Sequence, residues 1–151
     1  MRPWLIIPVL VLLALPSCGG SDEEVAQLPC VVPESEMAEI LDRDHVSAVP
    51  QDDGRCIYAS DGQALVSVSV TTREQFDAER DRFESGGVML PALVPAEGFE
   101  NEASVDPRYN SLNVTAGEQI IGVEIVGTEP SAPVEQLELE KDVARAALEG
   151  I

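Results

Sequence analysis

The apolar run at the N-terminus constrains this chain most, because it decides where the folded part begins and in which compartment that part folds. Arg2 is the only charged residue among the first seventeen, and a mostly apolar run from Trp4 to Leu15 follows it. One positive residue ahead of a short apolar run is typical of a secretory signal. The run is also shorter than the ~20 residues that a membrane-spanning helix needs. We therefore expect residues 1–17 to be a signal peptide.

Cys18 stands directly after this run. Leu15, Ser17 and Cys18 are similar to the bacterial lipobox, and this similarity implies cleavage before Cys18 and a lipid on its sulfur. The alternative is an ordinary signal peptide with a coincidental cysteine. Residues 18–29 are polar and suit a flexible tether. We expect residues 30–151 to fold as one domain, lipid-anchored on the extracytoplasmic face of the cell membrane.

The charge of the chain restricts its partners. It has 28 Asp and Glu residues against nine Lys and Arg, which gives a formal net charge of −19. Nucleic acid and anionic lipid head groups carry the same sign and would be repelled. The sequence therefore predicts no nucleic-acid partner, and it leaves membrane attachment to the lipid anchor.

Three cysteines are present, and acylation of Cys18 would leave Cys30 and Cys56 as a pair. In an exported protein such a pair is expected to form a disulfide. A metal site or a reactive thiol are the alternatives, and a metal would need more soft ligands than the single His45 supplies. We predict the disulfide, with no metal and no cofactor.

Hydrophobic spacing and turn residues predict the secondary structure. Asp61-Gly62 between two strand-like runs predicts a tight hairpin. Thr72 and Gln75 fit a capping box at a helix start. Val66 and Val68 alternate with serines, which indicates a sheet with one face toward water and antiparallel pairing. We predict strands over 55–60, 63–70, 102–105, 111–115 and 119–126, and helices over 35–44, over 72–85 and beyond 133.

These elements give an α+β fold in a single domain. The expected architecture is an antiparallel sheet of about five strands with helices packed on one face, in the order α-β-β-α-β-β-β-α.

Several short motifs resemble a family of small actinobacterial surface lipoproteins that share a domain of unknown function. They are Cys18 after the leader, Pro29-Cys30, an acidic helix over 36–41, Cys56-Ile57-Tyr58 opening a strand, and a turn over 98–103. The resemblance implies an anchored α+β domain with an antiparallel sheet. It implies no catalytic residues.

The apolar segment 88–95 is the candidate interaction surface. Exposed apolar patches usually mark a partner or ligand site, although such side chains can instead cover the open edge of a sheet. No Gly-x-Ser-x-Gly motif is present, and we predict no catalytic residues and no enzyme activity. We expect a non-enzymatic binding or accessory module for an unknown protein or apolar ligand. The alternatives are an envelope enzyme that uses unrecognised carboxylates and a structural envelope lipoprotein. The candidate residues are Val88, Met89, Leu90, Leu93 and Val94.

Overall fold

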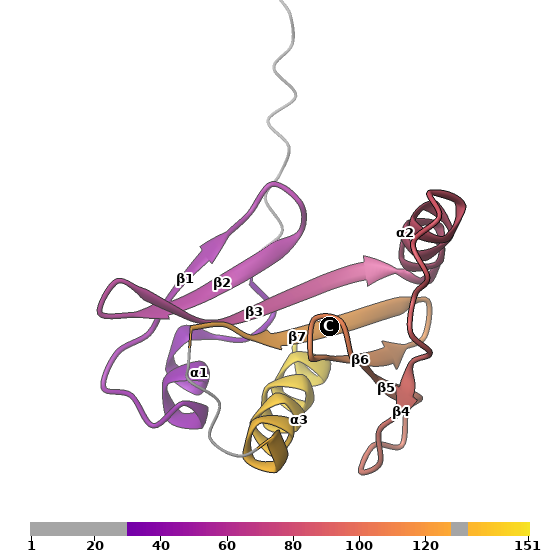
Figure 1. Ribbon diagram of the computed structural model, residues 1–151. Helices are drawn as coiled ribbons and strands as arrows, with labels where there is room; N and C mark the ends of the chain where they lie inside the picture. Colours follow the sequence, from indigo (N-terminus) through magenta and orange to yellow (C-terminus); the bar gives the residue numbers. More distant parts are fainter. Residues whose placement is uncertain (1–29, 128–132) are drawn as a thin grey trace, which may run out of the picture.

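The computed structural model describes residues 30–127 and 133–151. The predicted signal peptide over 1–17, Cys18 and the tether over 18–29 lie outside the described residues. The described chain forms one antiparallel sheet in the order β1-β2-β3-β7-β6-β5-β4, with three helices around it (Figure 1). The helices are α1 (Glu34–Ile40), α2 (Arg73–Ser85) and α3 (Pro133–Glu149). The strands are β1 (Ser47–Pro50), β2 (Arg55–Ser60), β3 (Gln63–Thr72), β4 (Val94–Pro95), β5 (Ala103–Asp106), β6 (Ser111–Ala116) and β7 (Gln119–Ile125).

The α+β class with an antiparallel sheet is confirmed, but the predicted strand count is wrong. The sheet has seven strands rather than about five, because β1 and β4 were not predicted. Both are short and end in proline, which lacks the amide hydrogen that a central strand needs. Both lie at the two outer edges of the sheet, where a proline is tolerated.

The hairpin between β2 and β3 turns at the predicted dipeptide. Asp61 and Gly62 have φ angles of 52° and 76°. Positive φ at both central residues is the geometry that matches the right-handed twist of the flanking strands. The turn pairs Ser60 with Gln63 and Ala59 with Ala64, and a register shift between Tyr58 and Ala59 then places Val66 opposite Tyr58. Together they set which residues of β3 face each side of the sheet.

The hydrophobic core lies between α1, α3 and one face of the sheet. Every second residue of β3, β6 and β7 points into it, as expected for strands with one buried face. Burying each such aliphatic side chain contributes roughly 1.5–3 kcal/mol. The core includes Met37 of α1, Val66 and Val68 of β3, Leu112 and Val114 of β6, Ile121 and Val123 of β7, and Val143, Ala144 and Ala147 of α3.

Helix α2 lies over the opposite face of the sheet, so the prediction that all helices pack on one face is wrong. Figure 1 shows α1 and α3 below the sheet and α2 above its right-hand end. Phe76 and Arg80 of α2 share a cavity with Ser69, whose side chain points away from the core. The spacing of Phe76 and Phe83 predicts that the helix packs through one stripe. That spacing carries no information about which face of the sheet receives it.

The capping box predicted at the start of α2 is confirmed. The Thr72 hydroxyl accepts from the Gln75 backbone amide at 3.1 Å, and the Gln75 side chain accepts from the Thr72 amide at 3.1 Å. No residue of this helix is fully buried. The cap satisfies two backbone amides at the start of the helix and contributes about 1 kcal/mol.

The predicted disulfide between Cys30 and Cys56 is present and joins the segment before α1 to β2. Two residues further along both segments, the Tyr58 hydroxyl donates to the Val32 carbonyl at 2.8 Å and accepts from the Val32 amide at 3.2 Å. Burial raises the pKa of Tyr58 to about 12, so this hydroxyl keeps its proton. The Cys-x-aromatic motif thus fastens the N-terminal segment at two adjacent points.

Candidate functional site

A groove of about 550 Å³ lies on the sheet face opposite α1 and α3. Its floor comes from β3, β6 and β7, and its walls come from α2, the turn between β5 and β6, and the start of β2. A smaller cavity of about 130 Å³ shares Phe76, Arg80, Asn113 and Ile120 with it. Small-molecule sites typically measure roughly 300–1,000 Å³. The groove is therefore the leading candidate site in the described part of the chain.

The floor of the groove is built from polar residues that alternate with core residues along the strands. Ser69 of β3, Gly122 of β7 and Asn113 of β6 lie opposite one another in the sheet register. A Cβ atom at position 122 would lie 2.6 Å from the Ser69 Oγ and 3.3 Å from the Asn113 Oδ1. Glycine at this position therefore leaves room for the two polar side chains to stand side by side.

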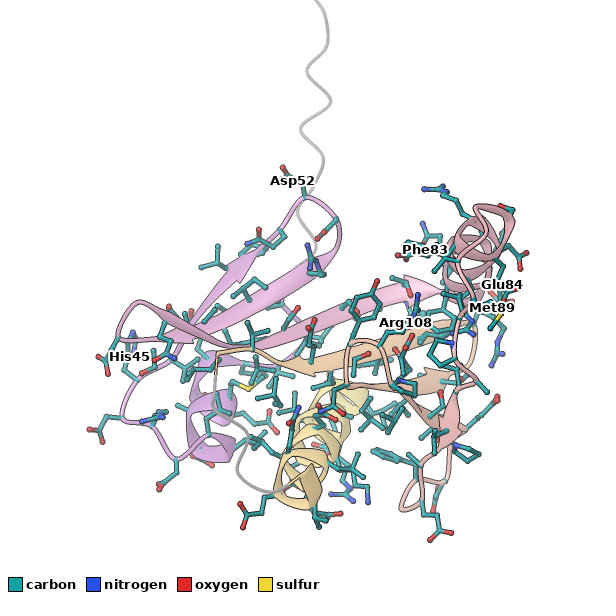
Figure 2. All side chains as sticks on the ribbon, in the orientation of Figure 1. His45, Asp52, Phe83, Glu84, Met89 and Arg108 are labelled. Atoms are coloured by element: carbon teal, nitrogen blue, oxygen red, sulfur yellow. A yellow bond between two sulfur atoms is a disulfide. The ribbon has the colours of Figure 1, made fainter. Side chains whose placement is uncertain are left out.

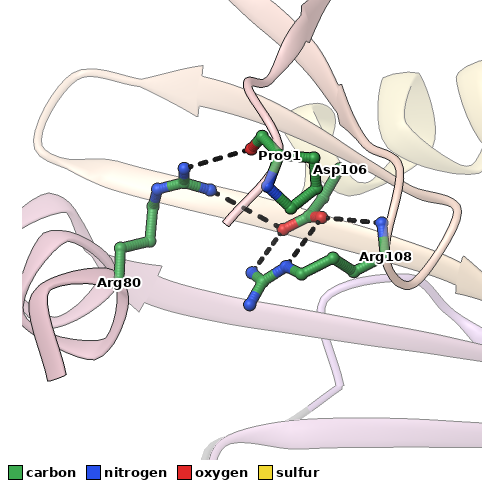
Figure 3. Close-up of polar contacts among 4 residues, drawn as sticks. All are labelled: Arg80, Pro91, Asp106 and Arg108. Atoms are coloured by element: carbon green, nitrogen blue, oxygen red, sulfur yellow. Dashed lines mark hydrogen bonds and ion pairs between the residues drawn. The ribbon is translucent and has the colours of Figure 1, made fainter. Parts of the chain in front are cut away.

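Three charged residues form the wall at the far end of the floor (Figure 3). The Arg108 Nη2 and Nε donate to the Asp106 carboxylate at 2.6 and 3.1 Å, and the Arg108 backbone amide donates to it at 3.0 Å. The Arg80 Nη1 lies 3.8 Å from the same carboxylate. Asp106 is only 3% exposed, so its charge needs these partners. Two arginines from separate elements thus share one buried carboxylate.

The Asp106 carboxyl is held in its ionised form. Its burial would raise the pKa, but the hydrogen bonds and charge of Arg108, together with the charge of Arg80, outweigh burial and lower the pKa below its usual value. The same contacts raise the pKa of the Arg108 guanidinium. This wall keeps a fixed pattern of charge at neutral pH.

Arg80 is held less firmly than Arg108. Its Nη2 donates to the Pro91 carbonyl at 3.5 Å, at the limit of a hydrogen bond. Its Nη1 is buried and makes no hydrogen bond to the residues that the structure describes. A buried guanidinium nitrogen without an acceptor is costly, so Arg80 has donor capacity that a ligand can use after a small movement.

Three aromatic rings gather around the groove. The Arg108 guanidinium lies 5.5 Å from the Phe83 ring centre and 4.8 Å from that of Tyr109, and Phe76 lines the groove directly. Figure 2 shows Phe83 and Arg108 at the same end of the molecule as Met89, with His45 at the opposite end. Stacking on both aromatic rings restricts the Arg108 side chain. Tyr109 remains 51% exposed and so offers ring surface to a ligand.

A second ion pair, between Arg55 and Asp53, borders the groove near the start of β2. The Arg55 Nη2 lies 2.7 Å from the Asp53 carboxylate, and both side chains are about half exposed. The hydrogen bond from Arg55 lowers the pKa of Asp53. Exposed pairs of this kind contribute little to stability. Their effect here is to fix one more donor and acceptor at the rim.

The predicted site residues have different outcomes. Cys18 lies outside the described residues, and Cys30 and Cys56 form the disulfide described above. In the segment 88–95, Val88 and Met89 are 50% and 95% exposed. Leu90 and Leu93 are half-buried, Leu93 lines the smaller cavity, and Val94 lies in the edge strand β4. The segment borders the groove through Pro91, and its role in partner binding stays a prediction.

The groove residues were not predicted from the sequence. One signal was present: the alternation of valine with Ser67 and Ser69 indicated a polar sheet face, which was interpreted only as a surface toward water. Asp106 ends β5 and Arg108 follows it by two residues, so these two are local partners. Arg80 comes from α2, and only the position of α2 over the sheet brings it to them.

No family model, curated protein or solved structure matches this chain. The resemblance to actinobacterial lipoproteins therefore stays a prediction. Within the described ranges, every helix falls short of the length and apolar character needed to cross a bilayer. Among the same residues, no three His, Cys, Asp or Glu side chains are grouped so that they could hold a metal ion.

Proposed function

We propose that this chain is a non-enzymatic binding module, tethered outside the cytoplasm through a lipid on Cys18, with the groove as its ligand site. The observation that carries the proposal is the row of polar side chains on the groove floor. Ser67, Thr71, Ser111 and Asn113 line the groove, and none of these side chains hydrogen-bonds to another described residue. Polar groups presented together in a concave site are the usual means of orienting a ligand.

The groove favours binding over catalysis. General acid-base chemistry needs a carboxyl whose pKa is tuned toward the working pH. The two groove carboxyls with shifted pKa, Asp53 and Asp106, both have lowered values and are both bonded to arginine. Glu140 is the described carboxyl with a raised pKa, and it lies on α3 and does not line the groove. An enzyme that uses carboxylates is therefore the weaker candidate.

Gly122→Val tests the groove directly. The new side chain would occupy the space between Ser69 and Asn113, where even a Cβ is crowded, while valine suits a β-strand. We expect at least one of five small polar probes to shift the backbone amide NMR signals of β3, β6 and β7 in the full-length protein, and we expect Gly122→Val to abolish these shifts. The probes are glucose, trehalose, succinate, citrate and putrescine at millimolar concentration.

Gln119→Val is the matched control, because it also introduces a valine into β7, at an exposed position outside the groove. It should leave the probe-induced shifts unchanged. If no probe shifts the floor residues, or if shifts persist in Gly122→Val, the groove is not the ligand site. The chain would then fit a structural envelope lipoprotein better.

The exposed side chains Val88 and Met89 support a second surface for a protein partner. Met89 is 95% exposed and adjoins the half-exposed Val88, and neighbouring exposed apolar side chains can mark a partner site. We expect the double variant Val88→Asp, Met89→Asp to lose a partner that co-purifies with the wild type from detergent-solubilised envelope. The control is Val49→Asp, because Val49 on β1 is an apolar residue that is as exposed as Val88. Retention of the partner by the double variant would rule out this segment.

The lipid tether has its own test. Intact mass measurement of protein purified from a bacterial host should show a chain that begins at Cys18 and carries a diacylglycerol. Cys18→Ser should abolish the added mass and release the protein from the membrane fraction. An unmodified chain that retains residues 1–17 would overturn the tether without affecting the groove.

A further inference from the structure

We propose that the ligand of the groove is a neutral, hydroxyl-rich molecule, namely a saccharide of one or two rings. This inference rests on the groove being the ligand site. Three properties of the groove select this class: the balance of its charges, the hydrogen-bonding character of its floor, and the aromatic surface at its rim.

The charges around the groove disfavour anions. Arg55, Arg80 and Arg108 line it together with four carboxylates, those of Asp53, Glu79, Asp106 and Glu124. All three arginines already have a carboxylate partner, Arg55 in Asp53 and both Arg80 and Arg108 in Asp106. An anion would meet the remaining carboxylates and the field of a chain with a net charge of −19. The same field attracts a cation, so the hydrogen-bonding character of the floor, and not its charge, distinguishes a cation from a neutral ligand.

The floor suits a partner that both donates and accepts hydrogen bonds. The hydroxyls of Ser67, Thr71 and Ser111 can each do both, and the Asn113 amide offers one acceptor and two donor hydrogens. Sugar hydroxyls have the same dual character, whereas a carboxylate only accepts and an ammonium only donates. A polyol can therefore satisfy a larger share of this floor than either charged class.

The end wall offers a matching site for one hydroxyl. The Arg80 Nη1 and the Asp106 Oδ2 are 3.8 Å apart, too far for a direct hydrogen bond. An oxygen placed between them after a small rotation of Arg80 can lie about 2.8 Å from both. Such an oxygen must accept from the guanidinium and donate to the carboxylate, which a hydroxyl does.

The aromatic rim suits the apolar face of a sugar ring. Tyr109 is 51% exposed and Phe76 is half-buried, and both line the groove from different walls. Ring C–H groups of a saccharide can lie against such surfaces while its hydroxyls contact the floor. Succinate, citrate and putrescine have no comparable ring face.

The test is a titration of the full-length protein, followed by amide NMR, with three classes of probe. The first is neutral saccharides: glucose, galactose, mannose, N-acetylglucosamine, trehalose and maltose. The second is the anions succinate and citrate, and the third is the cations putrescine and spermidine. We expect saturable shifts of the floor residues of β3, β6 and β7 with at least one saccharide, and none with the charged classes.

Two variants should weaken saccharide binding by tenfold or more: Asn113→Ala, which removes floor hydrogen bonds, and Arg80→Gln, which removes the end-wall donor. Arg82→Gln is the matched control, because it makes the same charge change in the same helix at an exposed side chain outside the groove. It should leave the affinity unchanged.

The outcomes separate the two proposals. Groove shifts with succinate, citrate, putrescine or spermidine but with no saccharide would overturn the saccharide inference and leave the binding module standing. Absence of groove shifts with all three classes would overturn both. Equal loss of saccharide affinity in Arg80→Gln and Arg82→Gln would show a response to net charge and would also count against the inference.

Discussion

Glu140 is a carboxyl in a position that the helix otherwise fills with apolar residues. On α3 it lies in register with Val143, Ala144 and Ala147, which pack into the core, and it is only 1% exposed. Burial is the main reason that its pKa rises to about 7, and the charge of Glu124 adds to the effect. The Gln136 side chain, which donates to Glu140 at 3.3 Å, compensates only in part.

The raised pKa makes the stability of the protein depend on pH. Between the ordinary value of 4.5 and about 7, the folded protein holds a proton on Glu140 that the unfolded chain has released. The stabilisation that comes from this proton on Glu140 is complete below pH 4.5 and is lost as the pH rises through 7. Glu140→Gln should therefore be more stable than wild type at pH 8, by up to about 3 kcal/mol, at ~1.36 kcal/mol per pKa unit.

The measurement is urea unfolding of both proteins at pH 5 and at pH 8. The quantity to compare is the difference in unfolding free energy between the variant and the wild type, because other carboxyls titrate in both proteins. Gln136→Ala is an informative companion, since loss of the donor to Glu140 should raise its pKa further. A difference that is the same at both pH values would show that Glu140 is ionised in the folded protein.

At the scale of elements, α2 is the one of the three described helices that buries the least. It has no fully buried residue. Phe76 and Arg80 face the groove, Arg73 donates to Thr115 of β6, and Phe83 lies against Arg108. Elements with few buried contacts open locally at low free-energy cost. Because α2 forms one wall of the groove, its opening would also open the site.

Thr72→Ala should make this opening more frequent. Loss of the capping hydroxyl costs about 1 kcal/mol, which corresponds to roughly a fivefold faster amide hydrogen exchange when exchange follows the opening equilibrium. The increase should be confined to α2, and the amides of β3 in the centre of the sheet serve as the internal control. Uniform acceleration across the sheet would mean that α2 unfolds only with the whole domain.

The elements that the sequence predicts correctly are those encoded by neighbouring residues. The turn at Asp61-Gly62 and the cap at Thr72 each depend on contacts within four positions, so their patterns are readable. The edge strands β1 and β4 pair with the next strand in the sequence, but they are short and each ends in a proline, so no alternating pattern predicts them. The face that α2 covers, and with it the groove, depends on tertiary packing. The candidate site therefore could not be predicted from local sequence patterns.

At the scale of the whole molecule, the two faces of the sheet differ: one face packs into the core and the other forms the groove. Helices α1 and α3 and the disulfide lie on the core side of the sheet. Cys56 and Tyr58 point to this side together with Val66 and Val68. The other side holds the groove, whose floor is polar. The residues that form the core and the residues proposed to bind the ligand thus alternate along the same strands, so each set can be perturbed separately.

Reduction of the disulfide should lower the stability of the domain without changing the groove. The bond closes a segment with a sequence separation of 26, and its loss is expected to lower the unfolding free energy by about 3–4 kcal/mol. Below the unfolding midpoint, the amide NMR signals of the groove floor should keep their positions, because the bond lies across the sheet from them. The measurement is urea unfolding with and without dithiothreitol, together with groove spectra of a Cys30→Ala, Cys56→Ala variant. If groove signals shift as strongly as those around Val32, the two faces are coupled, and binding of any groove ligand should then depend on the oxidation state of the pair.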